Sequence, residues 1–218
     1  MRTPAMLAVT AALLLPASLT AGLSPAAHAV SCPEVQFVFA RGTSEPAGLG
    51  RVGAALSDQL AAQMGGRSYG VYAVNYPATY DFLAAADGAA DATNHIAMVA
   101  KNCPSTRFVL GGYSQGAAVV DMLMGIPPLG NKVGDIGSAP PLPHSLADRV
   151  AAVAVFGNPA TRFGLPVTAA VAPFAGKGID LCADGDPICS QGRNPFAHTS
   201  YEKTDMVSQA AGFVAAML

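Results

Sequence analysis

The sequence predicts an α/β protein with one parallel β-sheet and helices on both faces of that sheet. Two observations support this prediction. Short apolar runs alternate along the chain with longer segments whose apolar residues recur at helical spacing, and strands that alternate with helices usually pair in parallel. In addition, the apolar run Phe108–Leu110 passes through a glycine-rich turn into a helix-compatible run of small residues. This is the strand, turn and helix start from which such sheets are built.

The first half of the chain supplies two strands and two helices. An apolar run at 35–40 predicts a buried strand, and a polar loop follows at 41–46. The segment 51–64 places apolar residues on one helical face, and two glycines end it. A second strand is expected at 69–74. A second helix is expected at 87–102, where a Cys-Pro pair stops it.

The second half follows the same alternation. The third strand stops at a glycine pair before Ser114, and the helix after Ser114 ends near residue 125. The stretch 126–146 is rich in proline and glycine and is expected to be a long surface connection. A fourth strand is predicted at 150–156, a short fifth at 178–181, and an amphipathic helix at about 200–217.

The segment Gly112-Tyr113-Ser114-Gln115-Gly116 matches the G-x-S-x-G nucleophile elbow. This turn holds its serine in a strained backbone conformation, so the residues two positions away on each side must be small. The geometry lifts the Ser114 hydroxyl out of the end of the sheet. An ordinary glycine-rich turn is the alternative, and the strand before and the helix after favour the elbow.

The first residues have the pattern of a secretory signal peptide. Met1 and Arg2 precede an apolar run at 5–15, and Ala27-His28-Ala29 offers small residues to a signal peptidase. The apolar stretch is short and broken, which disfavours a membrane anchor. We therefore expect a signal segment at 1–29 and a single domain at 30–218. The protein is expected to be exported, either extracellular or associated with the cell envelope, with no integral membrane segment after cleavage.

Composition excludes several functional classes. Charged residues make up 12% of the chain and the formal net charge is −2, so no basic surface invites nucleic acid. Metal, nucleotide and cofactor motifs are not found in the sequence, and the cysteines form no C-x-x-C pair for zinc. An even number of cysteines in an exported protein indicates two disulfides, for which sequence allows three pairings. A short loop closes readily, which favours Cys182–Cys189 and leaves Cys32–Cys103.

A serine nucleophile needs a histidine base, and the base needs a carboxylate that orients it. In this kind of fold the chain order is serine, acid, histidine. His198 is the candidate base near the carboxy terminus. Its candidate acids are three aspartates that the pattern alone does not separate: Asp180, Asp184 and Asp186.

Five segments together resemble the cutinase family, and most of all its actinobacterial secreted esterases. The resemblance covers nearly the whole mature chain, and the pairing of G-Y-S-Q-G with C-A-D-G-D-P-I-C is specific. The segments are Cys32-Pro33, Ala40-Arg41-Gly42-Thr43-Ser44-Glu45, Gly112-Tyr113-Ser114-Gln115-Gly116, Cys182-Ala183-Asp184-Gly185-Asp186-Pro187-Ile188-Cys189 and Phe196-Ala197-His198.

The resemblance implies a three-layer α/β/α sandwich around a five-stranded parallel sheet, a reduced α/β-hydrolase fold without a lid domain. It implies that Asp186, directly after a glycine, is the acid of the triad. It also implies an oxyanion hole made by the backbone N–H groups of Thr43 and Gln115, and it supports both disulfides as paired above. Thr43 keeps a hydroxyl on a stiff β-branched side chain, and the sequence leaves the direction of that hydroxyl open.

The expected activity is hydrolysis of short- to medium-chain acyl esters by a monomer without a cofactor. Four apolar residues in two loops are candidates for contact with the acyl chain, with ordinary packing as the alternative: Tyr80, Phe82, Leu83 and Phe196. The resemblance leaves room for phospholipids, for acetyl esters of polysaccharides and for polyesters. In a different class, an exported binding protein that has lost turnover is a further alternative.

Overall fold

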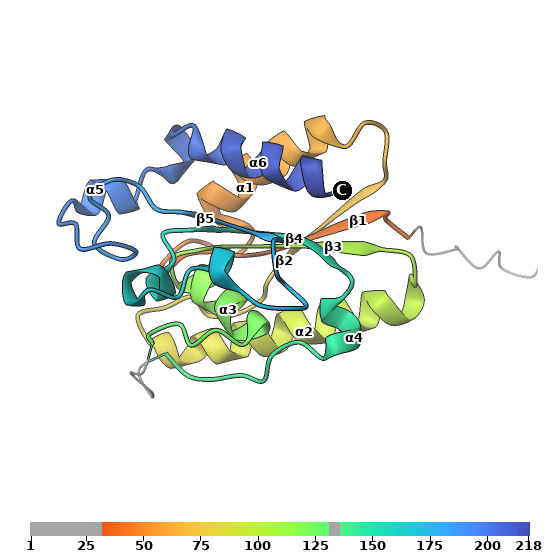
Figure 1. Ribbon diagram of the computed structural model, residues 1–218, viewed down its shortest axis with the longest axis horizontal. Helices are drawn as coiled ribbons and strands as arrows, with labels where there is room; N and C mark the ends of the chain where they lie inside the picture. The colour runs from red at the N-terminus through yellow and green to blue at the C-terminus, as the bar shows by residue number, and fades with distance from the viewer. Residues whose placement is uncertain (1–31, 131–135) are drawn as a thin grey trace, which may run out of the picture. The chain divides into compact units, whose positions relative to one another are not determined.

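The computed structural model describes residues 32–130 and 136–218, and the expected signal segment at 1–29 lies outside them. The described part of the chain forms a parallel five-stranded sheet in the order β2-β1-β3-β4-β5. The chain therefore runs outward from β1 to one edge and then from β3 to the other (Figure 1). The strands are β1 (Val35–Ala40), β2 (Tyr69–Ala73), β3 (Arg107–Tyr113), β4 (Val150–Phe156) and β5 (Gly178–Leu181).

Helices cover both faces of the sheet. Helices α1 (Gly50–Gln63) and α6 (Met206–Met217) lie side by side on one face (Figure 1). On the other face lie α2 (Ala85–Asn102), α3 (Gln115–Met124) and the short α4 (His144–Ala147). The three-layer prediction is confirmed. None of the helices in the described residues combines the length and the hydrophobicity needed to cross a bilayer.

Strand β4 shows how the sequence builds two cores. All of its residues are buried, because helices cover it on both sides. Val153 and Val155 point into the cluster beneath α2 and α3, whereas Ala152, Ala154 and Phe156 point into the cluster beneath α1 and α6. The period-2 alternation of a strand thus distributes one apolar run between the two layers.

Both predicted disulfides are present. Cys32–Cys103 ties the residues before β1 to the residue that follows α2, and Cys182–Cys189 closes a small loop after β5. The first bridge spans 71 residues. Closing a loop of that length removes about 4 kcal/mol of chain entropy from the unfolded state in the loop-entropy treatment.

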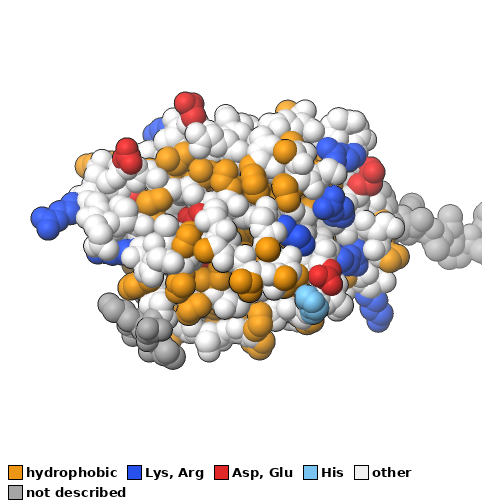
Figure 2. Space-filling model, in the orientation of Figure 1, with side chains coloured by type: hydrophobic (Ala, Val, Ile, Leu, Met, Phe, Trp, Pro, Cys, Tyr) orange, Lys and Arg blue, Asp and Glu red, His pale blue; other side chains and the backbone are white. Residues whose placement is uncertain are grey.

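Acidic and basic side chains are interspersed on one face of the molecule (Figure 2). On the face drawn in Figure 2, acidic and basic side chains both appear, set among hydrophobic ones. The small formal net charge of −2 agrees with this mixture.

Two predicted elements differ from the structure. The expected single helix at 200–217 is wrong, because the 3₁₀ turn Tyr201–Lys203 is separated from α6 by an extended Thr204. The Thr204 hydroxyl donates to the carbonyl of Tyr201 and accepts from the N–H of Met206, which stabilises the break. Strand β3 does not stop at its glycine pair but continues to Tyr113. Its parallel pairing with β1 runs to Gly112, and its pairing with β4 continues one residue further, from Tyr113 to Phe156.

Smaller differences concern the helix boundaries. Helix α2 begins at Ala85 rather than 87, after a 3₁₀ turn at Phe82–Ala84 in which the N–H of Leu83 donates to the Asp81 side chain. The connection predicted at 126–146 ends in the short helix α4, which its proline- and glycine-rich composition did not indicate. Residues 131–135 of that connection lie outside the described residues.

Candidate active site

Ser114 lies in the turn between β3 and α3 with φ 56° and ψ −117°. This is a left-handed backbone conformation that residues other than glycine rarely adopt. A Cβ at Gly112 would lie 2.2 Å from the carbonyl oxygen of Gly116, and a Cβ at Gly116 would lie 1.9 Å from the carbonyl oxygen of Ala40. Both contacts would be with backbone atoms, which cannot move aside as the end of a flexible side chain can. The two glycines of the motif are therefore required by the close approach of α3 to the strands.

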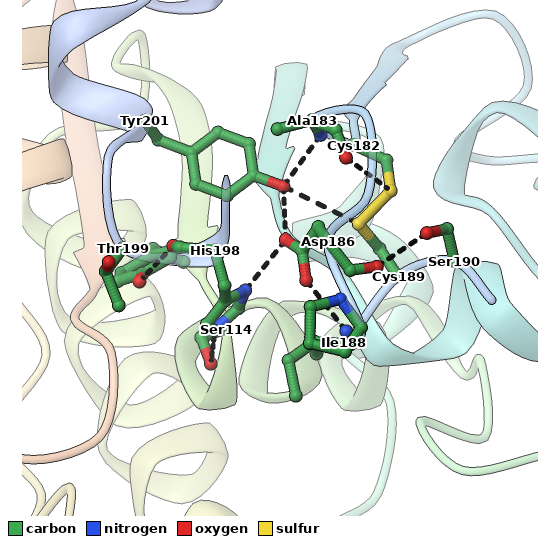
Figure 3. Close-up of polar contacts among 12 residues, drawn as sticks. Ser114, Cys182, Ala183, Asp186, Ile188, Cys189, Ser190, His198, Thr199 and Tyr201 are labelled. Atoms are coloured by element: carbon green, nitrogen blue, oxygen red, sulfur yellow. Dashed lines mark hydrogen bonds and ion pairs between the residues drawn. A yellow bond between two sulfur atoms is a disulfide. The ribbon is translucent and has the colours of Figure 1, made fainter. Parts of the chain in front are cut away.

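Ser114, His198 and Asp186 form a chain of hydrogen bonds (Figure 3). The Ser114 Oγ lies 2.8 Å from His198 Nε2, and His198 Nδ1 lies 2.8 Å from Asp186 Oδ2. The three residues follow β3 and β5, at the carboxyl edge of the parallel sheet, where ligands bind in open α/β folds. The residue pattern left the acid open among three aspartates, and the family resemblance implied Asp186. The structure places Asp186 in this contact and Asp184 in solvent. Asp180 is half-buried and accepts from Asn158, away from His198.

The environment of Asp186 favours its charged form. Burial by itself would raise the pKa of this carboxyl, but hydrogen bonds from His198, Tyr201 and the backbone N–H of Ile188 outweigh burial and lower the pKa below its usual value. The Tyr201 hydroxyl lies 2.6 Å from Oδ2, and the Ile188 N–H donates to Oδ1 over 2.7 Å. An ionised Asp186 accepts a hydrogen bond from the Nδ1–H of His198, which leaves Nε2 free to accept from Ser114.

His198 is the last residue of α5 (Pro195–His198), one helical turn rather than the loop expected. The Asn194 side chain accepts from the N–H of Phe196 and proline opens the turn, a standard helix start. The hydroxyl of Tyr113 donates to the carbonyl oxygen of His198 over 2.6 Å. The base is thus held through its backbone as well as through its ring.

The loop that carries Thr43 is held from inside. The buried Arg41 donates to the carbonyl of Tyr76 over 2.6 Å and to the carbonyl of Glu45 over 3.0 Å. In turn, Glu45 accepts from the N–H of Gly42 over 2.8 Å. The Thr43 hydroxyl lies 3.4 Å from Gln115 Oε1, so the two expected oxyanion residues come together. Gln115 opens α3, and the N–H groups of a first helical turn have no carbonyl acceptor within their own helix.

A cavity of about 560 Å³ opens over Ser114 and His198. Most of its lining is apolar, and Arg51 and Glu45 add charges at its border. Of the four apolar residues expected to contact substrate, Tyr80 and Phe82 line this cavity. Among the described residues, Leu83 and Phe196 are exposed without lining it. Their expected contact with substrate therefore has no support in this geometry, because both side chains face solvent outside the cavity.

Comparison with known proteins places this geometry in a family. A family model described as Cutinase matches residues 31–218. The chain belongs to the cutinase family. It is 50% identical over 200 residues to phospholipase Culp4 of Mycobacterium tuberculosis, covering 92% of this chain and 85% of that protein. It is 47% identical over 199 residues to carboxylesterase Culp1 of the same species, covering 87% of this chain and 84% of that protein.

Solved structures of two esterases have a similar fold. A Trichoderma reesei cutinase in complex with a phosphonate inhibitor superposes with a TM-score of 0.65 at 32% identity, covering 85% of this chain and 77% of that chain. The catalytic core of acetyl xylan esterase from Trichoderma reesei gives a TM-score of 0.71 at 26% identity, covering 86% and 100%. As a member of the cutinase family, the chain is a serine esterase that hydrolyses carboxylic esters.

Two tyrosines of this cutinase-family site were missed in the sequence. Tyr113 lies inside the elbow motif, at a position that the motif leaves open. Tyr201 fell inside the expected last helix, where nothing marks one aromatic residue as a partner of a carboxylate. In the described residues, no group of three or more His, Cys, Asp or Glu side chains is arranged to hold a metal ion.

Proposed function

We propose that this protein is a secreted esterase that acts on short- to medium-chain acyl esters through a triad of Ser114, His198 and Asp186. The observation that carries the proposal is the unbroken chain of two 2.8 Å contacts from Asp186 through His198 to Ser114 beneath an apolar cavity. The elbow strain at Ser114 adds support, since such strain is kept where the surrounding structure enforces it.

In the first half of the proposed reaction, His198 Nε2 takes the proton of the Ser114 hydroxyl as Oγ attacks the ester carbonyl carbon. Backbone N–H groups of Gln115 and Thr43 donate to the oxyanion, each contributing about 3 kcal/mol of transition-state stabilisation. The carbon–oxygen bond to the alcohol then breaks, and the alcohol leaves with the proton from His198. An acyl-enzyme on Ser114 remains.

In the second half, His198 takes a proton from water as the water oxygen attacks the acyl carbon. The bond to Ser114 Oγ breaks, the serine recovers its proton from His198, and the carboxylic acid is released. Asp186 stays ionised throughout and stabilises the imidazolium that forms twice.

Export is part of the proposal. The amino-terminal pattern of a signal peptide supports it, as do the two disulfides, which persist in oxidising compartments.

The acyl chain is expected to contact the apolar lining of the cavity near Tyr80 and Phe82. One relative is named a phospholipase, which favours phospholipids as the second candidate substrate. The cavity by itself suits an acyl chain from either source.

Hydrolysis of p-nitrophenyl esters with acyl chains of two to sixteen carbons, with and without the Ser114→Ala substitution, tests the proposal. We expect the greatest activity at short to middle lengths and its loss in the variant. Retained activity in Ser114→Ala would refute the role of Ser114. A long-chain optimum, together with release of fatty acid from phosphatidylcholine vesicles, would favour the phospholipase. An active-site serine phosphonate that fails to label the wild-type protein would favour the binding-protein alternative.

A further inference from the structure

The Tyr201 side chain is buried behind the chain of hydrogen bonds, with none of its surface exposed. Its ring packs edge-on against Phe156 at 5.9 Å and against Tyr113 at 5.8 Å, centroid to centroid. Phe156 ends β4 and Tyr113 ends β3, so the ring rests on the two central strands of the site. Because the ring is held on these two sides, the position of the hydroxyl is fixed as well.

The direction of the hydrogen bonds at the Tyr201 hydroxyl follows from its neighbours (Figure 3). The backbone N–H of Ala183 donates to it over 3.0 Å, which occupies a lone pair. The remaining neighbours are Asp186 Oδ2 at 2.6 Å and the Cys189 sulfur at 3.5 Å. That sulfur is in a disulfide and has no proton to give. The single phenol proton therefore goes to Asp186, the nearer and stronger acceptor.

We propose that Tyr201 is a positioning residue of the reaction, whose hydroxyl fixes the orientation of the Asp186 carboxylate and keeps it an acceptor for His198. The proposal rests on the triad proposed above. Asp186 Oδ2 accepts from Tyr201 and from His198 Nδ1, and Oδ1 accepts from Ile188. Every bond made by the carboxylate is thus one that only its ionised form accepts fully.

The consequence reaches His198 through this shared oxygen. Without the phenol proton, Asp186 Oδ2 would keep one donor in place of two and would become a stronger base. A stronger base beside Nδ1 stabilises the protonated imidazole, so His198 would hold its second proton to higher pH. Other titratable groups near the pair are Tyr113 from β3 and, at the border of the cavity, Glu45 and Arg51.

The Tyr201→Phe substitution tests this role, because it removes the hydroxyl and keeps the ring. The midpoint of the His198 ring titration, followed by NMR, does not depend on turnover. We expect that midpoint to rise by about half a unit to one unit, which is a change of about 3- to 10-fold in proton affinity. Below the midpoint, kcat/KM should fall by the same factor, while kcat/KM at higher pH falls less.

The matched control is Tyr113→Phe. Its hydroxyl also lies beside His198 but donates to the carbonyl oxygen of that residue, not to the carboxylate. The midpoint in this variant should equal that of the wild type. An unchanged midpoint in Tyr201→Phe, or an equal shift in both variants, would overturn the proposal. A lower kcat/KM at high pH in Tyr201→Phe, without a shift of the His198 midpoint, would mean that Tyr201 only packs.

A second measurement covers the case in which Tyr201→Phe does not fold. Site-specific replacement of Tyr201 by 3-fluorotyrosine keeps the ring and makes the phenol a stronger donor. The midpoint of His198 should then move to lower pH, and a midpoint that stays or moves to higher pH contradicts the proposal. Since the titration is read without substrate, an absence of esterase activity would count against the proposed function and not against the contact of Tyr201 with Asp186.

Discussion

The buried Asp121, away from the active site, should make the free energy of unfolding depend on pH. This residue lies on α3 and is completely buried. Its Oδ1 accepts from Asn158 Nδ2 over 3.1 Å, and the same nitrogen donates to Asp180 Oδ2 over 3.0 Å. Within residues 32–130 and 136–218, Asp121 Oδ2 has no hydrogen-bond partner. One amide therefore bridges a completely buried carboxyl group and a half-buried one.

Burial raises the pKa of Asp121 well above its usual value, and the nearby Asp180 raises that pKa further. The hydrogen bond from Asn158 acts in the opposite direction and is the smaller effect. The folded state therefore holds a proton on Asp121 that the unfolded chain loses near its ordinary pKa, at about pH 4. The free energy of unfolding must then fall as the pH rises from there toward the folded pKa, by up to about 1.4 kcal/mol per pH unit.

The Asp121→Asn substitution replaces the protonated acid by a neutral amide of the same shape, which cannot ionise. The Oδ1 of the new side chain can still accept from Asn158. We expect the stability of the variant relative to the wild type to increase as the pH rises above about 4, by at most about 1.4 kcal/mol for each pH unit. Urea denaturation at several pH values, with the disulfides intact, measures this difference directly.

The control for this experiment is Asp184→Asn, which makes the same change of charge at an exposed position. Its stability difference should vary little with pH. A difference for Asp121→Asn that is constant from pH 5 to pH 7, or that matches the control, would refute the reasoning. Asp186 does not confuse the result, because its lowered pKa affects stability only as the pH falls below about 4.

Two further predictions concern the elbow and the cavity. Gly116→Ala places a Cβ 1.9 Å from the Ala40 carbonyl oxygen and should destabilise the fold by about 3 kcal/mol or more in urea denaturation. Gly212→Ala on α6, where a Cβ meets nothing within 4 Å among the described residues, should instead stabilise it by about 0.5–1 kcal/mol; equal losses would contradict the steric argument. Phe82→Ala should change the chain-length profile of ester hydrolysis because Phe82 lines the cavity, whereas Phe196→Ala should leave that profile unchanged. A chain-length profile in Phe82→Ala that equals that of the wild type would mean that Phe82 only packs.

Much of the fold could be predicted because its signals are local. Strands 150–156 and 178–181 have the predicted bounds, since apolar runs between turn residues define them without help from distant contacts. The elbow was recognisable because its two glycines are required by close backbone contacts, one within the five-residue motif and one with the end of β1. The local disulfide was predictable because a short loop leaves its cysteines few other partners.

The sequence by itself therefore determined the layer order, the position of Ser114 and a short set of candidate acids. The residue pattern left three candidate acids, and the family resemblance implied Asp186. The tertiary structure brings Asp186 into contact with His198, and it explains why Asp184 and Asp186 differ although they lie two residues apart. The tertiary structure also places Tyr201 outside the last helix, where its hydroxyl donates to Asp186. It brings Asp121 and Asp180 to the same side-chain amide, that of Asn158. These contacts join residues from different strands and helices. Their energies depend on burial and on hydrogen-bond partners that are brought together by the fold, and no short stretch of sequence contains that information.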